Sequence, residues 1–244
     1  MRANFTHICR ASIDLLGQLV VTATAPAIEA RELYRFYHVG DDETQALRGV
    51  SLAVQPGEIV AVVGPSGSGK STLIACLAGL DEPDGGFVYV NGDRLSRRDE
   101  KARTSMRARK IGILLQAGNL FDHLTVDQNL RLKMRLAGKR DSARIGEVLE
   151  MVGISKRRHA YPTQLSGGEA SRAGLAVALA PRPPILIADE PTGEVDSETE
   201  QRILSVFEAH RKSGGAILLV THSEAIASRA DRIIRLEDGK IVNA

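Results

Sequence analysis

Short apolar runs, each followed by polar turn residues, recur along this chain and alternate with amphipathic stretches. These runs are too short for helices and predict buried strands at 59–63, 111–115, 185–188, 217–220 and from 233 onward. A helical pattern over 197–211 separates the third run from the fourth, as expected for parallel strands joined by crossover helices. The pattern therefore predicts an α/β fold with a mainly parallel sheet.

Two stretches depart from this alternation. Residues 28–55, together with the run 87–90 that turns at Asn91-Gly92, predict an N-terminal antiparallel β subdomain. Residues 117–164 are more polar and helical, with amphipathic segments at 126–136 and 142–152. We expect residues 27–244 to form one domain, with a helical subdomain at about 117–164 and a hairpin around Glu237 to Lys240.

Residues 1–26 lie outside these patterns. The apolar stretch at 13–25 is interrupted by Asp14, Gly17 and Gln18, so we expect a poorly ordered N-terminal extension. A signal peptide, or a start codon assigned too far upstream, are the alternatives for this segment.

A phosphate-binding motif follows the first buried run. Residues Gly64-Pro65-Ser66-Gly67-Ser68-Gly69-Lys70-Ser71 lie between a predicted strand and a predicted helix, as a phosphate loop requires. Gly67 and Gly69 allow backbone N–H groups to face phosphate oxygens, and the helix from about Lys70 adds its positive end. Lys70 would reach the β- and γ-phosphates, and Ser71 would offer its hydroxyl to Mg²⁺. The alternative is a glycine-rich turn with an accidental lysine.

A pair of carboxylates follows the run at 185–188. Asp189 and Glu190 come where a parallel strand ends, at the edge where ligands of open α/β sheets bind. We expect Asp189 to hold Mg²⁺ directly or through water, and Glu190 to polarise the water that attacks the γ-phosphate. Paired acids after a strand are often only a solvated turn, but the phosphate loop upstream favours the chemical interpretation.

Composition narrows the class of protein. The 244 residues are 43% hydrophobic and 25% charged, which supports a sizeable core, and no apolar run approaches the ~20 residues of a membrane helix. The net charge of +2 argues against a nucleic-acid partner. The basic cluster at 94–110 is interrupted by acids and is expected to be a solvated face. Cys9 and Cys76 lack metal-ligand spacing and suggest a reducing compartment, with Cys76 in the core.

One further motif carries a resemblance to a known family. Leu165-Ser166-Gly167-Gly168-Glu169 is similar to the signature of the nucleotide-binding subunits of ABC transporters, which the chain resembles from about residue 28 to its C-terminus. The resemblance implies a P-loop NTPase core, an antiparallel β subdomain and a helical insert that carries the signature. It also implies that Gln116 contacts Mg²⁺ and the attacking water, that His222 contacts the γ-phosphate, and that Tyr37 stacks on adenine. Tyr34 or Phe36 could replace Tyr37 chemically, and all three could simply pack within a strand.

The expected site residues fall into three groups by role. The resemblance implies an ATP hydrolase with Mg²⁺, whose catalytic residues are Glu190, His222, Gln116 and Lys70. The metal would be held by Ser71, Gln116 and Asp189. Asp196 resembles an aspartate on a loop that crosses to the opposing subunit. The residues expected to bind the nucleotide are Tyr37, Gly64, Pro65, Ser66, Gly67, Ser68, Gly69, Lys70, Ser71, Thr72, Ser166, Gly167, Gly168, Glu169 and Asp196.

The signature also predicts partners. Ser166 and the following glycines open a helix whose N–H groups suit an anion, and in the family that anion is the γ-phosphate bound by the other chain. Two copies arranged head to tail would therefore complete two sites. The resemblance further implies an integral-membrane permease as partner and a peripheral location on the cytoplasmic face of the membrane.

Finer details point to one branch of the family. Residues 189–193, Tyr161-Pro162 and 116–120 are similar to the lipoprotein-releasing and macrolide-exporting branch. The chain departs from the family at Ala170-Ser171, at Val177 and at Glu194-Val195. We hypothesise that Glu194 weakens dimer closure by repulsion across the two-fold axis.

Several functional alternatives remain. An importer subunit would use the same groups, as would a non-transport ABC ATPase, although no second cassette or coiled-coil insertion is visible. A P-loop kinase would give no reason for the signature. The transported cargo is not encoded in this chain, because specificity lies in the membrane subunit.

Overall fold

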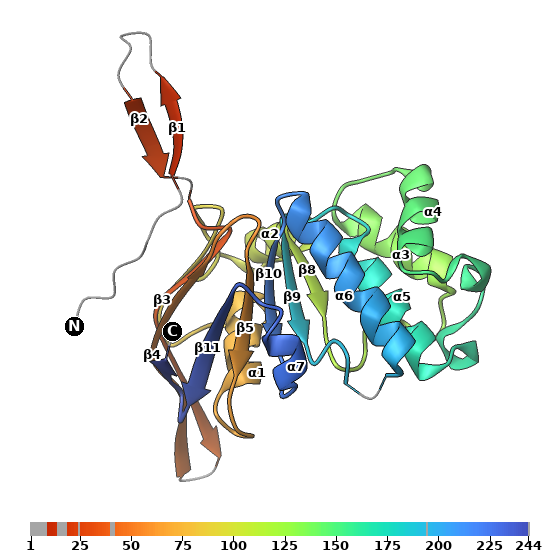
Figure 1. The fold of residues 1–244 in the computed structure, drawn as a ribbon. Coiled ribbons are helices and arrows are strands. Elements are labelled where there is room, and N and C mark those ends of the chain that lie inside the picture. The colour runs from red at the N-terminus through yellow and green to blue at the C-terminus, as the bar shows by residue number, and fades with distance from the viewer. Residues whose placement is uncertain (1–8, 14–18, 24, 40–41, 194, 244) are drawn as a thin grey trace.

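A computed structural model describes residues 9–13, 19–23, 25–39, 42–193 and 195–243 of the 244-residue chain. Its centre is a six-stranded sheet in which five strands run parallel, in agreement with the predicted α/β fold (Figure 1). In spatial order the strands are β12 (Lys240–Asn243), β11 (Arg232–Glu237), β5 (Ile59–Val63), β10 (Ala216–Val220), β9 (Ile185–Asp189) and β8 (Ile111–Leu114). β12 pairs antiparallel with β11 through the predicted hairpin at 237–240.

A second, antiparallel sheet confirms the predicted β subdomain. Its order is β4 (Asp42–Val54), β3 (Ile28–Val39), β6 (Gly85–Val90) and β7 (Asp93–Arg94). The long β3–β4 hairpin extends to the same end of the molecule as the carboxyl ends of the parallel strands (Figure 1). The subdomain therefore projects beside the edge where the predicted site lies.

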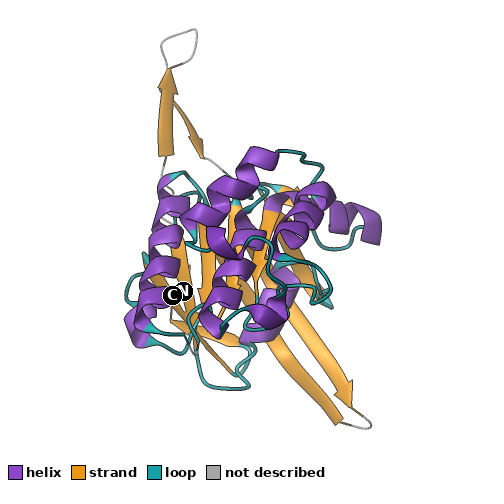
Figure 2. Cartoon of the chain, turned by 90° about the vertical axis from the view of Figure 1, so that its right-hand side faces the viewer, coloured by secondary structure: helices purple, strands orange, loops and turns teal. Residues whose placement is uncertain are grey.

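Helices cover the parallel sheet on both sides. α1 (Lys70–Leu77) and α2 (Glu100–Lys110) lie on the side of the antiparallel sheet, and the other helices cover the opposite face, where Figure 2 shows helices in front of the strands. These are α3 (Val126–Leu136), α4 (Ser142–Met151), α5 (Gly167–Leu179), α6 (Ser197–Lys212) and α7 (Glu224–Ala227), with 3₁₀ turns at Ser155–Arg157 and Pro162–Gln164. No helix in the described part of the chain is long and apolar enough to cross a membrane.

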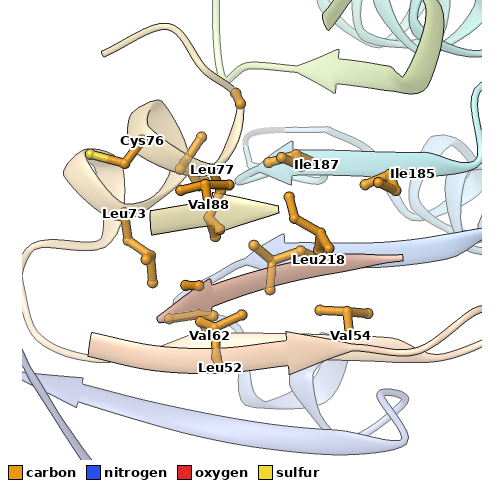
Figure 3. Close-up of a cluster of buried hydrophobic side chains, with 14 of the residues drawn as sticks. Leu52, Val54, Val62, Leu73, Cys76, Leu77, Val88, Ile185, Ile187 and Leu218 are labelled. Carbon is orange, nitrogen blue, oxygen red and sulfur yellow. The ribbon is translucent and has the colours of Figure 1, made fainter. Parts of the chain in front are cut away.

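The strands are apolar on both faces because each face packs into a separate core. Along β9, Ile185 and Ile187 enter the core shared with the antiparallel sheet, whereas Leu186 and Ala188 enter the core beneath the helices. Figure 3 shows the first core, where Leu73, Cys76 and Leu77 of α1 pack over Val62, Val88 and Leu218. Cys76 is 1% exposed, which confirms its predicted place in the core, and burial raises the pKa of its thiol to about 12.

The helical insert is continuous with the second core. Val126, Leu130, Ile145 and Val148 belong to the same buried cluster as strand residues such as Leu186. α5 joins the two parts, since it contacts α3, α4 and β8. At the expected subdomain boundary near residue 164 the chain therefore passes from the helical insert back to the α/β fold, but the hydrophobic core continues across it.

The N-terminal extension contains two short strands. Cys9–Ile13 (β1) and Leu19–Ala23 (β2) form a separate two-stranded antiparallel sheet within the segment that the sequence predicts to be poorly ordered. The consecutive β-branched residues Val20, Val21 and Thr22 favour the extended conformation that this pairing needs. Residues 1–8, 14–18 and 24 of the extension lie outside the described residues.

Candidate functional site

The predicted phosphate loop connects β5 to α1 at the carboxyl edge of the parallel sheet. Gly67 and Gly69 have φ of 78° and 101°, in the left-handed region that favours glycine. A side chain at Gly69 would lie 2.4 Å from the carbonyl oxygen of Ala46, whereas one at Gly67 would meet nothing within 4 Å. The loop is thus closed toward the β subdomain and open on the side of Gly67, where an anion can approach.

Lys70 is 7% exposed and lies inside the loop. Its Nζ donates to the carbonyl oxygens of Gly64 at 2.8 Å and Pro65 at 2.7 Å. Burial lowers the pKa of Lys70, and the nearby carboxylates of Glu190 and Asp189 oppose that shift. The ammonium group therefore sits on the loop that would surround a phosphate, within the field of both predicted acids.

Glu190 occupies a special backbone position directly after β9. Its φ of 47° lies in the left-handed region, and its N–H donates to the carbonyl oxygen of Val220 at 2.9 Å. This turn takes the side chain away from the strand direction and toward β10. Oε2 accepts a hydrogen bond from Thr221 at 3.3 Å, and Oε1 lies 3.5 Å from Nε2 of His222.

The carboxylate oxygen of Glu190 that Thr221 does not bond has the chemistry of a general base. Oε1 is buried and makes no hydrogen bond to any residue in the described ranges, and Ser68 Oγ in the phosphate loop shares this property. Buried polar atoms of this kind normally have a partner, often water or a ligand. The structure thus brings Glu190 and His222 together, with one carboxylate oxygen that makes no hydrogen bond within the described residues.

The predicted metal ligands form a chemically suitable set. Ser71 supplies a hydroxyl, Gln116 an amide oxygen and Asp189 a carboxylate, which are the hard oxygen ligands that Mg²⁺ prefers. Burial and the adjacent Glu190 raise the pKa of Asp189, while Lys70 and His222 act in the opposite direction. A divalent cation would relieve the repulsion between the two carboxylates, so the residues present fit that ion.

A cleft joins Gln116 to Glu190 and to the start of α5. Gln116, Glu190, Gly167, Ala170 and Ser171 all line it, and no residue of the phosphate loop does. The loop of Gln116 is fixed by Asn119, whose side chain accepts from the N–H of Leu115 at 2.8 Å and donates to its carbonyl oxygen at 2.6 Å. Gly167 of the signature therefore lines the same cleft as Glu190, whereas no phosphate-loop residue lines it.

The signature begins α5 with a reciprocal cap. Ser166 Oγ accepts from the N–H of Glu169 at 3.2 Å, and Glu169 Oε2 accepts from the N–H of Ser166 at 3.0 Å. Arg157 pairs with the other oxygen of Glu169 at 2.8 Å. The hydrogen bonds from Arg157 and from the backbone N–H of Ser166 lower the pKa of Glu169.

Asp196 has a local role in the described structure. It is the N-cap of α6, accepting from the N–H of Thr199 at 2.9 Å and from its hydroxyl at 2.8 Å. Thr199 also accepts from Arg172 of α5 and lies against Gly168 of the signature. The structure therefore links the signature helix to the start of α6, while Glu194 lies outside the described residues.

Tyr37 lies near the end of β3, opposite Thr44 of β4. The residue is 36% exposed, and its hydroxyl donates to Asp81 at 3.0 Å. Ala46 of β4 borders the phosphate loop at Gly69. Tyr37 pairs with Thr44, two residues before Ala46 on the same strand, which places Tyr37 near that loop. Tyr34 is 39% exposed but sits beside Gly49 and Gly85, within the sheet packing.

Two polar residues with a place in this site escaped the sequence analysis. Thr221 is 1% exposed and bonds Glu190, and Asn119 fixes the loop of Gln116. A polar residue between an apolar strand and His222 was a signal for Thr221. No comparable signal marked Asn119, because its bonds to Leu115 depend on the loop conformation.

Comparisons with known proteins agree with this geometry. Residues 47–193 match the family model described as ABC transporter. The chain is 39% identical over 222 residues to the lipoprotein-releasing system ATP-binding protein LolD of Hyphomonas neptunium, covering 89% of this chain and 97% of that protein. It is 42% identical over 223 residues to the methionine import ATP-binding protein MetN of Brucella abortus, covering 89% of this chain but only 59% of that protein.

Solved structures show the same fold. The dimeric bacterial ABC transporter cassette MJ0796 matches with a TM-score of 0.84 and 34% identity, covering 88% of this chain and 97% of that one. A second structure of that cassette, at 33% identity and a TM-score of 0.84 with the same coverage, is a dimeric post-hydrolysis state bound to ADP and Pi.

Proposed function

Because the chain belongs to the ABC transporter family and is one of its ATP-hydrolysing subunits, we propose that it closes as a homodimer on ATP to drive a separate membrane permease of the export or lipoprotein-release type. The observation that carries this proposal is the cleft in which Gln116, Glu190 and the start of α5 meet without the phosphate loop. A second copy, related by a two-fold axis, would present its signature to this chain's phosphates.

We assign the chemistry to this chain's residues as follows. Lys70 and the loop amides bind the β- and γ-phosphates, and the N-terminus of the partner copy's α5 binds the γ-phosphate from the other side. Glu190 orients and polarises the attacking water through Oε1, and His222 lies 3.5 Å from that oxygen. Mg²⁺, held by Ser71, Gln116 and Asp189, would supply positive charge that offsets the phosphate charge.

An apolar groove supports the permease as partner. It lies beside the loop that holds Gln116 and is lined in part by Leu80, Phe121 and Leu136, which are 48%, 55% and 61% exposed. Exposed apolar side chains gathered in one groove are typical of a protein-binding surface. Leu115, Gly118 and Asn119 also line it, so a segment seated there would contact the Gln116 loop directly.

The groove also indicates the character of the bound segment. Lys133 lines it, and burial together with the positive Arg107 lowers the pKa of its ammonium group. An apolar segment of the permease that brings one carboxylate would therefore match the groove. We place the chain on the cytoplasmic face of the membrane, peripherally, because such a segment would be its attachment.

The second candidate is an importer subunit. The similarity to MetN favours it, although this chain spans 59% of the length of that relative. The residues at 189–193, at 161–162 and at 116–120 favour the export or lipoprotein-release branch, as does the coverage of 97% of LolD. The two candidates share the catalytic site and differ in the permease.

The decisive experiment is to isolate the full chain from membranes in mild detergent and identify what co-purifies. A permease with a large extracytoplasmic region supports the export or release type, whereas a compact permease with a binding protein supports import. Leu136→Asp should abolish co-purification without changing the ATPase activity of the isolated chain. Val242→Asp is the matched control, since Val242 is 47% exposed on β12 and lies outside the groove.

A further inference from the structure

A cluster of charged side chains lies between β3 and the segment that follows α1. Arg35 donates through Nε and Nη2 to the two oxygens of Asp81 at 2.9 and 3.0 Å, and through Nη1 to Asp84 at 3.1 Å. Its side chain is 21% exposed. The planar guanidinium is thus fixed by two carboxylates in a geometry that a lysine could not reproduce.

Tyr37 is held by the same cluster. The Cζ atom of Arg35 lies 4.7 Å from the centre of the Tyr37 ring, within the range of a cation–π contact. The Tyr37 hydroxyl donates to Oδ2 of Asp81, the oxygen that also accepts from Nε of Arg35. One face of the ring is therefore covered by the cation and its polar end is anchored, while Tyr37 as a residue remains 36% exposed.

The cluster is attached to the phosphate loop by two routes. The N–H of Asp81 donates to the carbonyl oxygen of Ala75 in α1, the helix that begins at Lys70. On the other side, Ala46 of β4 borders Gly69, and β4 pairs with β3 next to Arg35. The ring of Tyr37 thus has a fixed position relative to the groups that would bind the phosphates.

We propose that Arg35 is a positioning residue for nucleotide binding, which together with Asp81 holds the Tyr37 ring so that its uncovered face receives the adenine base. This inference rests on the proposed function, in which Tyr37 stacks on the base. Fixing the ring before the ligand arrives reduces the conformational entropy lost on binding. The effect falls on affinity for the base and not on hydrolysis of the phosphate.

The test compares two arginines in the same strand. Arg31 is a matched control, because its Cζ lies 4.5 Å from the Tyr89 ring and it pairs with Glu29 at 2.8 Å, away from the cluster. Titration calorimetry would measure binding of MgATP and of magnesium tripolyphosphate, which lacks the base, to the full chain. We expect Arg35→Met to weaken MgATP binding by roughly three- to tenfold. It should leave tripolyphosphate binding and kcat at saturating ATP unchanged, and Arg31→Met should change none of these.

Two milder variants test the same role if Arg35→Met does not fold. Tyr37→Phe keeps the ring and loses only the hydrogen bond to Asp81. Arg35→Lys keeps the positive charge but cannot make the paired guanidinium hydrogen bonds to Asp81. Both should weaken MgATP binding by less than Arg35→Met does. If Arg35→Met binds MgATP as tightly as Arg31→Met, or loses tripolyphosphate affinity in parallel, the positioning role is wrong.

Tyr37→Ala separates this inference from the proposed function. A loss of MgATP affinity in Tyr37→Ala without a loss in Arg35→Met overturns the role of Arg35 alone. If Tyr37→Ala binds MgATP normally, the stacking role assigned to Tyr37 is itself wrong.

Discussion

The hydroxyl of Thr221 donates to Oε2 of Glu190 at 3.3 Å, and the same hydroxyl oxygen accepts the N–H of Ser223 at 3.0 Å. Thr221 is 1% exposed, so this chain of hydrogen bonds is shielded from water. It joins the residue after β9 to the residue after β10. The second oxygen of Glu190 is buried and makes no hydrogen bond within the described part of the chain.

Removal of the Thr221 hydroxyl should slow hydrolysis. Thr221→Val keeps the shape and deletes one hydrogen bond to the carboxylate, which corresponds to about 1 kcal/mol, or roughly a fivefold lower kcat. KM for ATP should change little, because the hydrogen bonds of Thr221 within the described residues go to Val62, Glu190 and Ser223 and not to the phosphate loop. Steady-state kinetics would check this, with Thr221→Ser as the control that retains the hydroxyl. If all three proteins have the same kcat, the Thr221 hydroxyl does not contribute to hydrolysis.

Neutralising Glu190 should trap the ATP-bound dimer. Glu190→Gln retains the shape and the groups that bind nucleotide but loses the base, so kcat should fall by about 10²- to 10⁴-fold. Light scattering with MgATP should then show a dimer. Glu198→Gln, on the exposed first turn of α6, serves as the control. A Glu190→Gln protein that stays monomeric in MgATP would show that the carboxylate has another role.

The two signature glycines should respond oppositely to alanine. A Cβ at Gly168 would lie 2.7 Å from Thr199 Oγ1 and 3.2 Å from Asp196 Oδ2, whereas one at Gly167 would meet nothing within 4 Å. Gly168→Ala should lower the free energy of unfolding by about 1–3 kcal/mol through overpacking. Gly167→Ala should leave it unchanged or raise it slightly, since alanine favours the helix. Urea unfolding of the monomer without nucleotide measures both, and equal values would contradict the contact with Thr199.

Ionisation of Asp127, in the first turn of α3, should contribute to the pH dependence of the protein's stability. Its side chain is 11% exposed and pairs with Arg131 at 2.5 Å and Arg158 at 2.7 Å. Burial alone would raise the pKa of Asp127, but the two arginines outweigh it and lower the pKa. A lowered pKa in the folded state stabilises the protein above the unfolded value of about 3.9, and that contribution is lost as pH falls through the folded value.

Asp127→Asn should therefore reduce the free energy of unfolding by about 1–2 kcal/mol at pH 7, and by less at about pH 3, below the unfolded pKa. Urea unfolding at the two pH values gives the difference directly. Asp122→Asn is a suitable control, because Asp122 is exposed and precedes α3. A pH-independent effect of Asp127→Asn would mean that side-chain packing, and not the charge, stabilises α3.

The sequence by itself determined the fold class and the identity of most candidate site residues. Apolar runs with a carboxylate pair, a histidine or a phosphate loop at their ends are local patterns, and parallel strands place such ends at one edge. The strands at 59–63 and 185–189 and the helices beginning near 126, 142 and 197 all occur where these patterns predicted them.

Only the tertiary structure decided which groups touch. The contact of Thr221 with Glu190 joins two strands adjacent only in space, and Arg35 reaches Asp81 across 46 positions of sequence. The cleft at the start of α5 excludes this chain's own phosphate loop for the same reason. The buried residues of α5 belong to the core beneath the helices, to which α1 contributes none of its described residues. Sequence patterns report local periodicity and side-chain chemistry, whereas hydrogen bonds between distant segments depend on how the two cores bring those segments together.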